Sequence, residues 1–74
     1  MSTYTAIFDG AVDGAIWGWI PEISGATGMG ETIEQAEVSL KAGLDIWFET
    51  EREFGRRIPP PSVIGIRTIS TDAA

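Results

Sequence analysis

The stretch Ala15-Ile-Trp-Gly-Trp-Ile-Pro21 decides how the rest of this chain folds. Aromatic and β-branched side chains favour a strand over residues 15–20, and Pro21 ends it because proline has no backbone N–H to donate. Side chains two residues apart project from the same face of a strand, so Trp17 and Trp19 share one face. The opposite face carries the remaining side chains: Ile16, Gly18 and Ile20.

One of these two faces must lie under a helix. A glycine allows a helix to approach closely, so we expect the Gly18 face to point inward. The outer face then holds a partner-binding set from three strands: Ile7, Trp17, Trp19 and Val63. Two exposed tryptophans make a larger apolar patch than a soluble monomer usually shows. In the reversed register both tryptophans lie in the core instead, and the sequence leaves that alternative open.

The flanking segments predict an antiparallel meander. Residues 3–9 alternate in the period of a strand, with Tyr4, Ala6 and Phe8 inward, and residues 10–14 supply the glycines and aspartate of a turn. After Pro21 we expect a loop over residues 22–25 and a short third strand over residues 26–29.

A long helix follows the third strand. Thr32-Ile-Glu-Gln35 fits a capping box, so the helix begins at Ile33, and Gly55 suits the left-handed position after its end. Apolar positions at three- and four-residue steps form its buried stripe: Ile33, Ala36, Leu40, Leu44, Trp47, Phe48 and Phe54. A second apolar line lies on the far face and indicates possible self-association: Val38, Ala42 and Ile46.

The C-terminal part predicts a fourth strand. Pro59–Pro61 form a stiff connector, residues 63–69 are rich in β-branched side chains, and residues 70–74 have no apolar pattern and should fray. The expected fold is therefore α+β, in the order β-β-β-α-β, with one long helix packed on one face of the sheet. We expect a single domain with its core in residues 3–69.

Composition narrows the function. The chain has 74 residues and a formal net charge of −6, and it contains no Cys and no His. These absences exclude thiolate and imidazole chemistry, and the negative charge opposes binding to nucleic acid but favours a basic protein. No signal peptide or membrane span is recognisable, so we expect a soluble cytoplasmic protein of a prokaryote. A chain this short has a marginal core, which favours a homo-oligomer, a dimer or tetramer.

Carboxylates give little indication of catalysis. Asp9 and Asp13 flank one turn, and a metal-dependent nuclease would need further carboxylates from neighbouring strands. Asp before Gly is ordinary turn chemistry. We therefore expect no metal, no cofactor and no enzymatic activity. The acidic residues near the helix end form a solvated face or a landing site for a basic partner: Glu49, Glu51 and Glu53.

A set of short strings, taken in order, resembles one known family. They are Tyr4, Asp13-Gly14, Pro21-Glu-Ile23, Gly25, Gly30-Glu-Thr-Ile-Glu-Gln-Ala36, Ile58-Pro59 and Pro61-Ser62. Together they resemble the HicB family, the antitoxins of HicA–HicB toxin–antitoxin pairs, over residues 4–62. Ala26 stands where the family often has Cys. The resemblance implies a partial ribonuclease-H-like fold with the fourth strand beside the first.

The resemblance also implies a function. A HicB-like chain would bind and neutralise a small basic HicA-type ribonuclease toxin. Many family members continue into a DNA-binding domain, and we expect this chain to correspond to the toxin-binding domain alone. The alternative is an orphan HicB-like domain that acts as a homo-oligomeric structural or small-ligand-binding module. A small hydrolase is a third and weaker reading.

Overall fold

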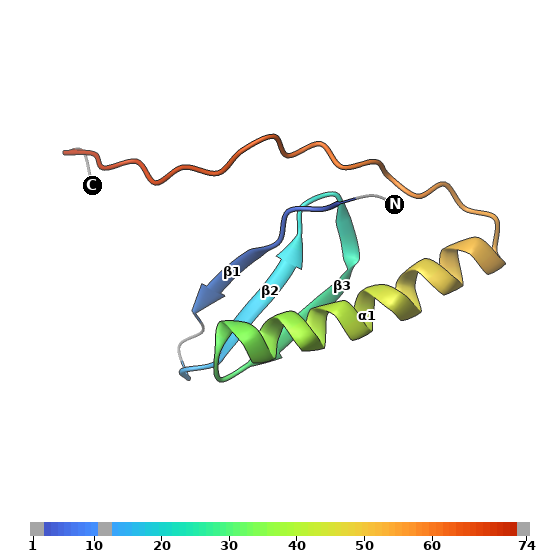
Figure 1. The fold of residues 1–74 in the computed structure, drawn as a ribbon, viewed down its shortest axis with the longest axis horizontal. Coiled ribbons are helices and arrows are strands. Elements are labelled where there is room, and N and C mark those ends of the chain that lie inside the picture. Colours follow the sequence, from blue (N-terminus) through green and yellow to red (C-terminus); the bar gives the residue numbers. More distant parts are fainter. Residues whose placement is uncertain (1–2, 11–12, 73–74) are drawn as a thin grey trace.

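The computed structural model describes residues 3–10 and 13–72 and shows one sheet and one helix (Figure 1). The elements are β1 (Ile7–Gly10), β2 (Ile16–Ile20), β3 (Ile23–Gly30) and α1 (Ile33–Glu53). The sheet is an antiparallel meander in the order β1-β2-β3, and α1 packs on one face. The predicted α+β class is confirmed in these elements. Residues 11–12 of the predicted turn and residues 73–74 of the predicted frayed end lie outside the described residues.

The β2–β3 connection is tighter than predicted. Ile20 pairs directly with Ile23, so Pro21 and Glu22 alone form the turn, and β3 extends over eight residues. The predicted loop over residues 22–25 is therefore wrong. Between the pairs Trp19–Thr27 and Ile20–Ile23 the register shifts, so that β3 carries three extra residues, 24–26. This irregularity interrupts strict alternation, and Ile20 and Ile23 both enter the core.

The first strand is shorter than predicted and shifted along the chain. Ile7 pairs with Trp19, and Phe8 pairs with Gly18. Continuing this register would place Thr5 opposite Pro21, which has no N–H to donate. The ladder therefore begins at Ile7, and the residues before it reach the core without belonging to the sheet: Tyr4 and Ala6 pack against it.

Both ends of α1 follow the sequence prediction. The Gln35 amide donates to Thr32 Oγ1 at 3.1 Å, and Gln35 Oε1 accepts from the Glu31 amide at 2.9 Å. The side chain of Gln35 thus reaches one residue further back than a standard capping box requires. At the other end Gly55 has φ 68°, its amide donates to the Arg52 carbonyl, and the next amide donates to that of Glu51. This pair of bonds is a Schellman motif.

Glycines in β3 let α1 lie directly on the strand. A side chain at Gly28 would meet the backbone of Ala36 and Leu40, and one at Gly30 would meet Gln35. Gly18 is also buried on this face, but the Phe8 ring covers it, since a Cβ there would lie 2.7 Å from that ring. The inward orientation of Gly18 is therefore as predicted, but the close approach of the helix expected at Gly18 occurs instead at Gly28 and Gly30 of β3.

The core is small and lies between α1 and the inner face of the sheet. The buried apolar residues are Ile20, Ile23, Ala26, Ala36 and Leu40. Partly buried side chains surround four of them: Tyr4, Ala6, Leu44, Trp47 and Phe48. Aromatic contacts extend the core toward the end of α1, where the ring centroids of Trp47 and Phe48 lie 5.2 Å apart in a T-shaped arrangement.

The segment after α1 differs most from prediction. Within the described residues, 63–69 belong to no strand, and the chain runs extended past β1 (Figure 1). The predicted fourth strand beside β1 is therefore not formed in the isolated chain. The radius of gyration is 14.2 Å, whereas a compact domain of this length is expected at about 11 Å. The excess reflects this projecting segment.

Candidate functional site

The outer face of the sheet carries large apolar side chains that no described element covers. Trp17 and Trp19 point away from α1, as the buried Gly18 and Ile20 between and beside them point toward it. Ile7 shares this face because it pairs with Trp19. Trp17 is 42% exposed. The open alternative of a reversed register is thus excluded, while partner binding at these residues stays a prediction.

Met29 belongs to the same face, although it is not among the residues predicted there. It pairs with Trp17 across β2 and β3 and is 50% exposed. Alternation from the inward Gly28 could have identified it. Val63, in contrast, lies in the extended segment and in no strand, so its predicted place on the outer sheet face is wrong. We call Ile7, Trp17, Trp19 and Met29 the tryptophan face.

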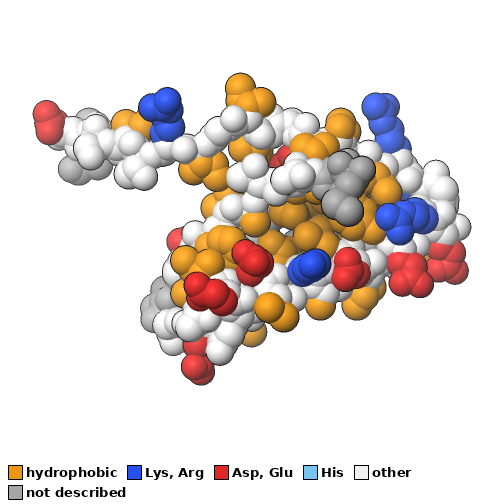
Figure 2. Space-filling view, viewed as in Figure 1, with side chains coloured by type: hydrophobic (Ala, Val, Ile, Leu, Met, Phe, Trp, Pro, Cys, Tyr) orange, Lys and Arg blue, Asp and Glu red, His pale blue; other side chains and the backbone are white. Residues whose placement is uncertain are grey.

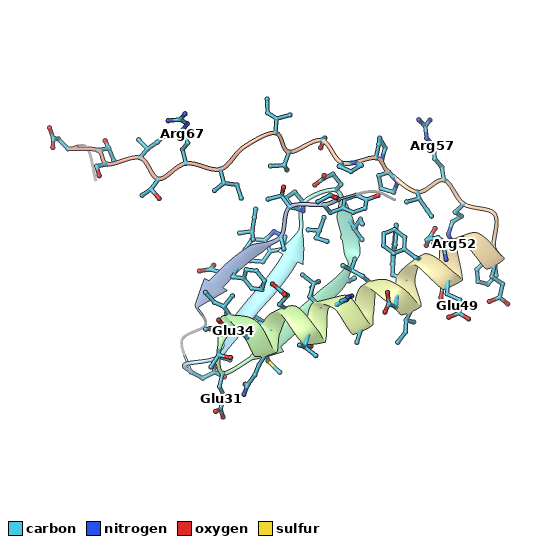
Figure 3. All side chains as sticks on the ribbon, in the orientation of Figure 1. Glu31, Glu34, Glu49, Arg52, Arg57 and Arg67 are labelled. Carbon is cyan, nitrogen blue, oxygen red and sulfur yellow. The ribbon has the colours of Figure 1, made fainter. Side chains whose placement is uncertain are left out.

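The far side of α1 presents a mixed apolar and acidic surface. Val38, Ala42 and Ile46 are exposed there, as their four-residue spacing predicts, and we call them the outer helix stripe. Exposed acidic residues flank the stripe: Glu34, Asp45, Glu49 and Glu53. Figure 2 shows acidic side chains along α1, and Figure 3 shows Glu49 pointing away from the sheet. Self-association through this stripe stays a prediction.

A groove lies between α1 and the N-terminal segment that leads into β1. Its volume is about 900 Å³. Apolar side chains from both walls line it, namely Ala6, Ile20, Leu40, Leu44 and Phe48. Charged side chains of α1 also contribute: Glu37, Lys41, Asp45 and Arg52. Figure 2 shows apolar atoms lining the corresponding hollow above α1. The sequence pattern does not predict this groove, because it predicts a fourth strand beside β1.

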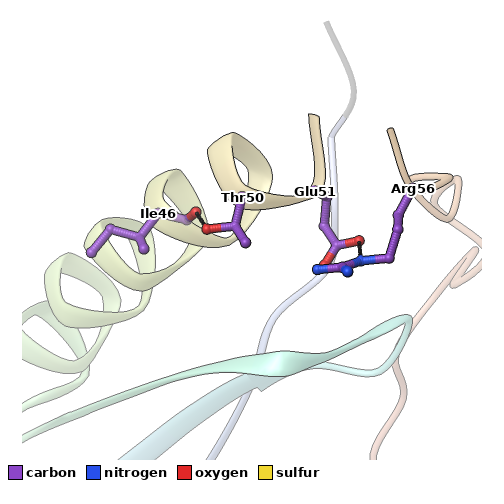
Figure 4. Close-up of polar contacts among 4 residues, drawn as sticks. All are labelled: Ile46, Thr50, Glu51 and Arg56. Carbon is purple, nitrogen blue, oxygen red and sulfur yellow. Dashed lines mark hydrogen bonds and ion pairs between the residues drawn. The ribbon is translucent and has the colours of Figure 1, made fainter. Parts of the chain in front are cut away.

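An ion pair closes the end of α1. Arg56 Nε lies 2.7 Å from Glu51 Oε2, and this hydrogen bond and the carboxylate charge raise the pKa of the Arg56 guanidinium (Figure 4). The Glu51 side chain is only 12% exposed. The Arg56 guanidinium also lies 4.8 Å from the Phe54 ring centroid. Glu51 is therefore engaged within the chain, and of the predicted acidic landing site Glu49 and Glu53 remain exposed.

The carboxylates considered for catalysis do not gather. Asp13 Oδ1 accepts the Ala15 amide at 3.2 Å, which is a turn contact, and Asp9 pairs with Trp17 on the outer sheet face. Among residues 3–10 and 13–72, no group of three His, Cys, Asp or Glu side chains is arranged to hold a metal ion.

Two hydrogen bonds hold the start of the C-terminal segment. The Tyr4 hydroxyl donates to the Pro59 carbonyl at 2.5 Å, and the Ser62 amide donates to Glu22 Oε2 at 2.7 Å. The other carboxylate oxygen of Glu22 is buried without a hydrogen-bond partner in the described structure. These contacts connect residues 55 and 40 positions apart in the sequence.

Comparisons with known proteins identify a relative. The chain is 43% identical over 60 residues to UPF0150 protein ssl0738 from Synechocystis sp., covering 81% of this chain and 83% of that protein. No family model and no solved structure matches. Within the described residues, no helix combines the length and the apolar content that crossing a membrane requires. Identity at this level over most of both chains shows that the chain belongs to the UPF0150 family.

Proposed function

We propose that this chain is a HicB-like antitoxin domain that binds and masks a small basic HicA-type ribonuclease. The observation that carries the proposal is the tryptophan face, an apolar surface without a covering element in the described chain. Tryptophans in the centre of an interface commonly contribute the largest share of binding energy. The resemblance to the HicB family over residues 4–62 supplies the identity of the partner.

Charge supports the same proposal. The net charge of −6 and the exposed carboxylates of α1 attract a basic protein, and complementary fields raise the rate of encounter. The carboxylates lie on α1, while the tryptophan face lies on the opposite side of the sheet. The acidic helix therefore steers the partner at long range, and the tryptophan face supplies the close contact. On this proposal the chain binds and does not catalyse.

The experiment starts from the neighbouring reading frame. If it encodes a short basic protein containing a His, that protein is co-expressed and its affinity for this chain is measured by titration calorimetry. Trp17→Thr with Trp19→Thr should weaken binding at least about 30-fold, because truncating an interface aromatic commonly costs about 2 kcal/mol or more. The matched control, Val38→Thr with Ile46→Thr, removes two exposed apolar residues from the outer helix stripe and should retain binding.

Salt dependence tests the steering role of α1. Association measured by stopped flow should slow as the ionic strength rises to about 0.15 M, where charges further apart than roughly 8 Å are screened. Absence of binding to the encoded basic protein, or equal binding by the native chain and the tryptophan variant, would contradict the proposal.

A second candidate is an orphan HicB-like domain that self-associates or binds a small ligand. The exposed outer helix stripe favours it, because three aligned apolar residues on a helix can pack against another copy. A neighbouring frame without a basic protein, together with an oligomer disrupted by the Val38 and Ile46 variant, would favour this second function.

A further inference from the structure

Residues 63–69 form an extended apolar segment that lacks a strand partner. The sequence Val63-Ile-Gly-Ile-Arg-Thr-Ile69 is rich in β-branched residues and contains no proline. Its three isoleucines are exposed large apolar side chains: Ile64, Ile66 and Ile69. A segment of this composition favours pairing with the edge of a sheet. The described part of this chain does not provide that pairing.

The two edges of the sheet differ in accessibility. At the β3 edge, the Met29 amide donates to Ser39 Oγ of α1 at 3.2 Å, and Gly43 of α1 lies close to the Thr27 carbonyl oxygen. The helix therefore covers the β3 edge. At the β1 edge, the described residues place no strand, and its backbone groups remain open to a partner. An additional strand is thus expected at β1.

The groove between α1 and the N-terminal segment that leads into β1 can accept the side chains of such a strand. Ala6 and Ile20 line it from the sheet side, and Leu44 and Phe48 line it from α1. Alternate residues of a strand project from the same face, so Ile64 and Ile66 enter the groove together when the segment lies along β1. Burying the side chains of Ile64 and Ile66 in the groove removes apolar surface from water and so contributes favourably to the free energy of binding.

Two hydrogen bonds, which we call the anchors, fix where the segment begins. Tyr4 and Glu22 hold Pro59 and Ser62 at the start of the segment. Between the anchors, prolines fix φ and restrict the preceding residues to extended conformations, so the connector does not turn back tightly. Beyond Ser62 the chain continues past its own sheet, and Arg67 projects away from it (Figures 1 and 3). Beyond its start the described segment is thus not paired with its own sheet.

Charge favours this contact over one between two outer helix stripes. Glu34, Asp45 and Glu49 would meet their equivalents in a helix-to-helix contact between copies, and like charges repel. Residues 63–69 contain a single charged side chain, the cation Arg67. Pairing through the segment therefore brings no acidic residues of two segments together.

We propose that residues 63–69 of one copy bind along β1 of a second copy, with Ile64 and Ile66 in its groove. In a two-fold dimer the exchange is reciprocal, so each groove receives the segment of the other chain. The exchanged strand completes the sheet and adds apolar contacts to a small core. This assembly does not depend on the toxin and leaves the tryptophan face of both copies open.

Sedimentation velocity of the full chain tests the assembly. The native chain should sediment as a dimer, and Ile64→Asp with Ile66→Asp should raise the dimer dissociation constant at least about 30-fold, as expected for loss of buried interface anchors. The matched control, Val38→Asp with Ile46→Asp, changes two exposed apolar residues on α1 and should remain dimeric. Helix content by circular dichroism should be unchanged in both. A monomeric native chain, or a dimer insensitive to the segment variant, overturns the proposal.

A crosslinking experiment distinguishes exchange from folding back within one chain. Thr68 is replaced with the photoreactive residue p-benzoylphenylalanine in unlabelled chain, which is refolded together with native chain labelled with ¹⁵N. After illumination, mass spectrometry should find unlabelled segment joined to labelled peptides from the N-terminal region or α1. The two kinds of chain must be shown to mix under these conditions. If the unlabelled segment is then joined only to unlabelled peptides, the segment pairs within its own chain and the proposal is overturned.

Discussion

The two faces of the sheet carry side chains of opposite size. The face under α1 has Gly18, Ala26 and Gly28, whereas the bare face has Trp17, Trp19 and Met29. Hydrophobicity alone would place the tryptophans inside. Here the helix backbone approaches β3 so closely that small residues are required beneath it, and a large side chain there would force the layers apart. In β2 and β3, small residues thus mark the face that packs against α1, and large apolar residues mark the face that is available to a partner.

This comparison also separates the three tryptophans. Trp47 lies on α1, packs against the core and stands over Gly25, whose missing side chain leaves room for the indole. Trp17 and Trp19 have no such glycine opposite them and lie on the uncovered face. The same residue type therefore stabilises the fold at one position and remains available for a partner at the others.

Of the substitutions considered, Gly28→Ala should most strongly disrupt the packing of α1 on the sheet. The new Cβ would overlap the backbone of Ala36 and Leu40, which moves only if α1 shifts. We expect a loss of at least about 3 kcal/mol in the free energy of unfolding, at the upper end of overpacking effects. Urea denaturation measures it. The matched control is Gly10→Ala, where no atom lies within 4 Å of the added carbon; equal losses at both glycines would contradict the close-packing argument.

A smaller loss is expected for Trp47→Ala. Removing a partly buried indole takes away its contacts with Phe48 and leaves space over Gly25, for an expected loss of about 2 kcal/mol in the free energy of unfolding. Trp17→Ala on the bare face serves as control and should cost less than about 1 kcal/mol. Thermal or urea unfolding with the same probe compares them. A larger loss for Trp17 would reverse the assignment of the two faces.

The smallest effect on folding is expected for Met29→Thr. Met29 is half exposed and pairs with Trp17, and threonine suits a strand surface, so the free energy of unfolding should change by less than about 0.5 kcal/mol. Affinity for the basic partner should fall if Met29 belongs to the binding surface. Calorimetric titration beside urea denaturation measures the two quantities, and a variant that loses stability but not affinity would remove Met29 from the tryptophan face.

Local patterns predict the parts of this fold that depend on near neighbours. The alternation around Gly18 identifies the two faces of β2, Thr32 and Gln35 mark the start of α1, and Gly55 marks its end. Each of these rests on sterics or hydrogen bonds within a few residues. They can therefore be recognised without knowing the rest of the structure.

Features that depend on distant residues could not be predicted in the same way. Ile23 stands alone between turn residues in the sequence, and its burial follows from a register shift across β2 and β3. The β-rich composition of residues 63–69 predicts a strand but not the edge that accepts it. The groove lies between α1 and a segment that belongs to no strand, and Met29 joins the tryptophan face through its pairing with Trp17.

The two hydrogen bonds at the start of the C-terminal segment have a consequence for folding kinetics. They close long stretches of chain, whereas β1, β2, β3 and α1 follow one another with short connections. Contacts between near neighbours form with little loss of chain entropy, so the meander and helix should form before Tyr4 and Glu22 capture the segment. The segment should also be the first to open, and its amides should exchange hydrogen with solvent well before those of β2.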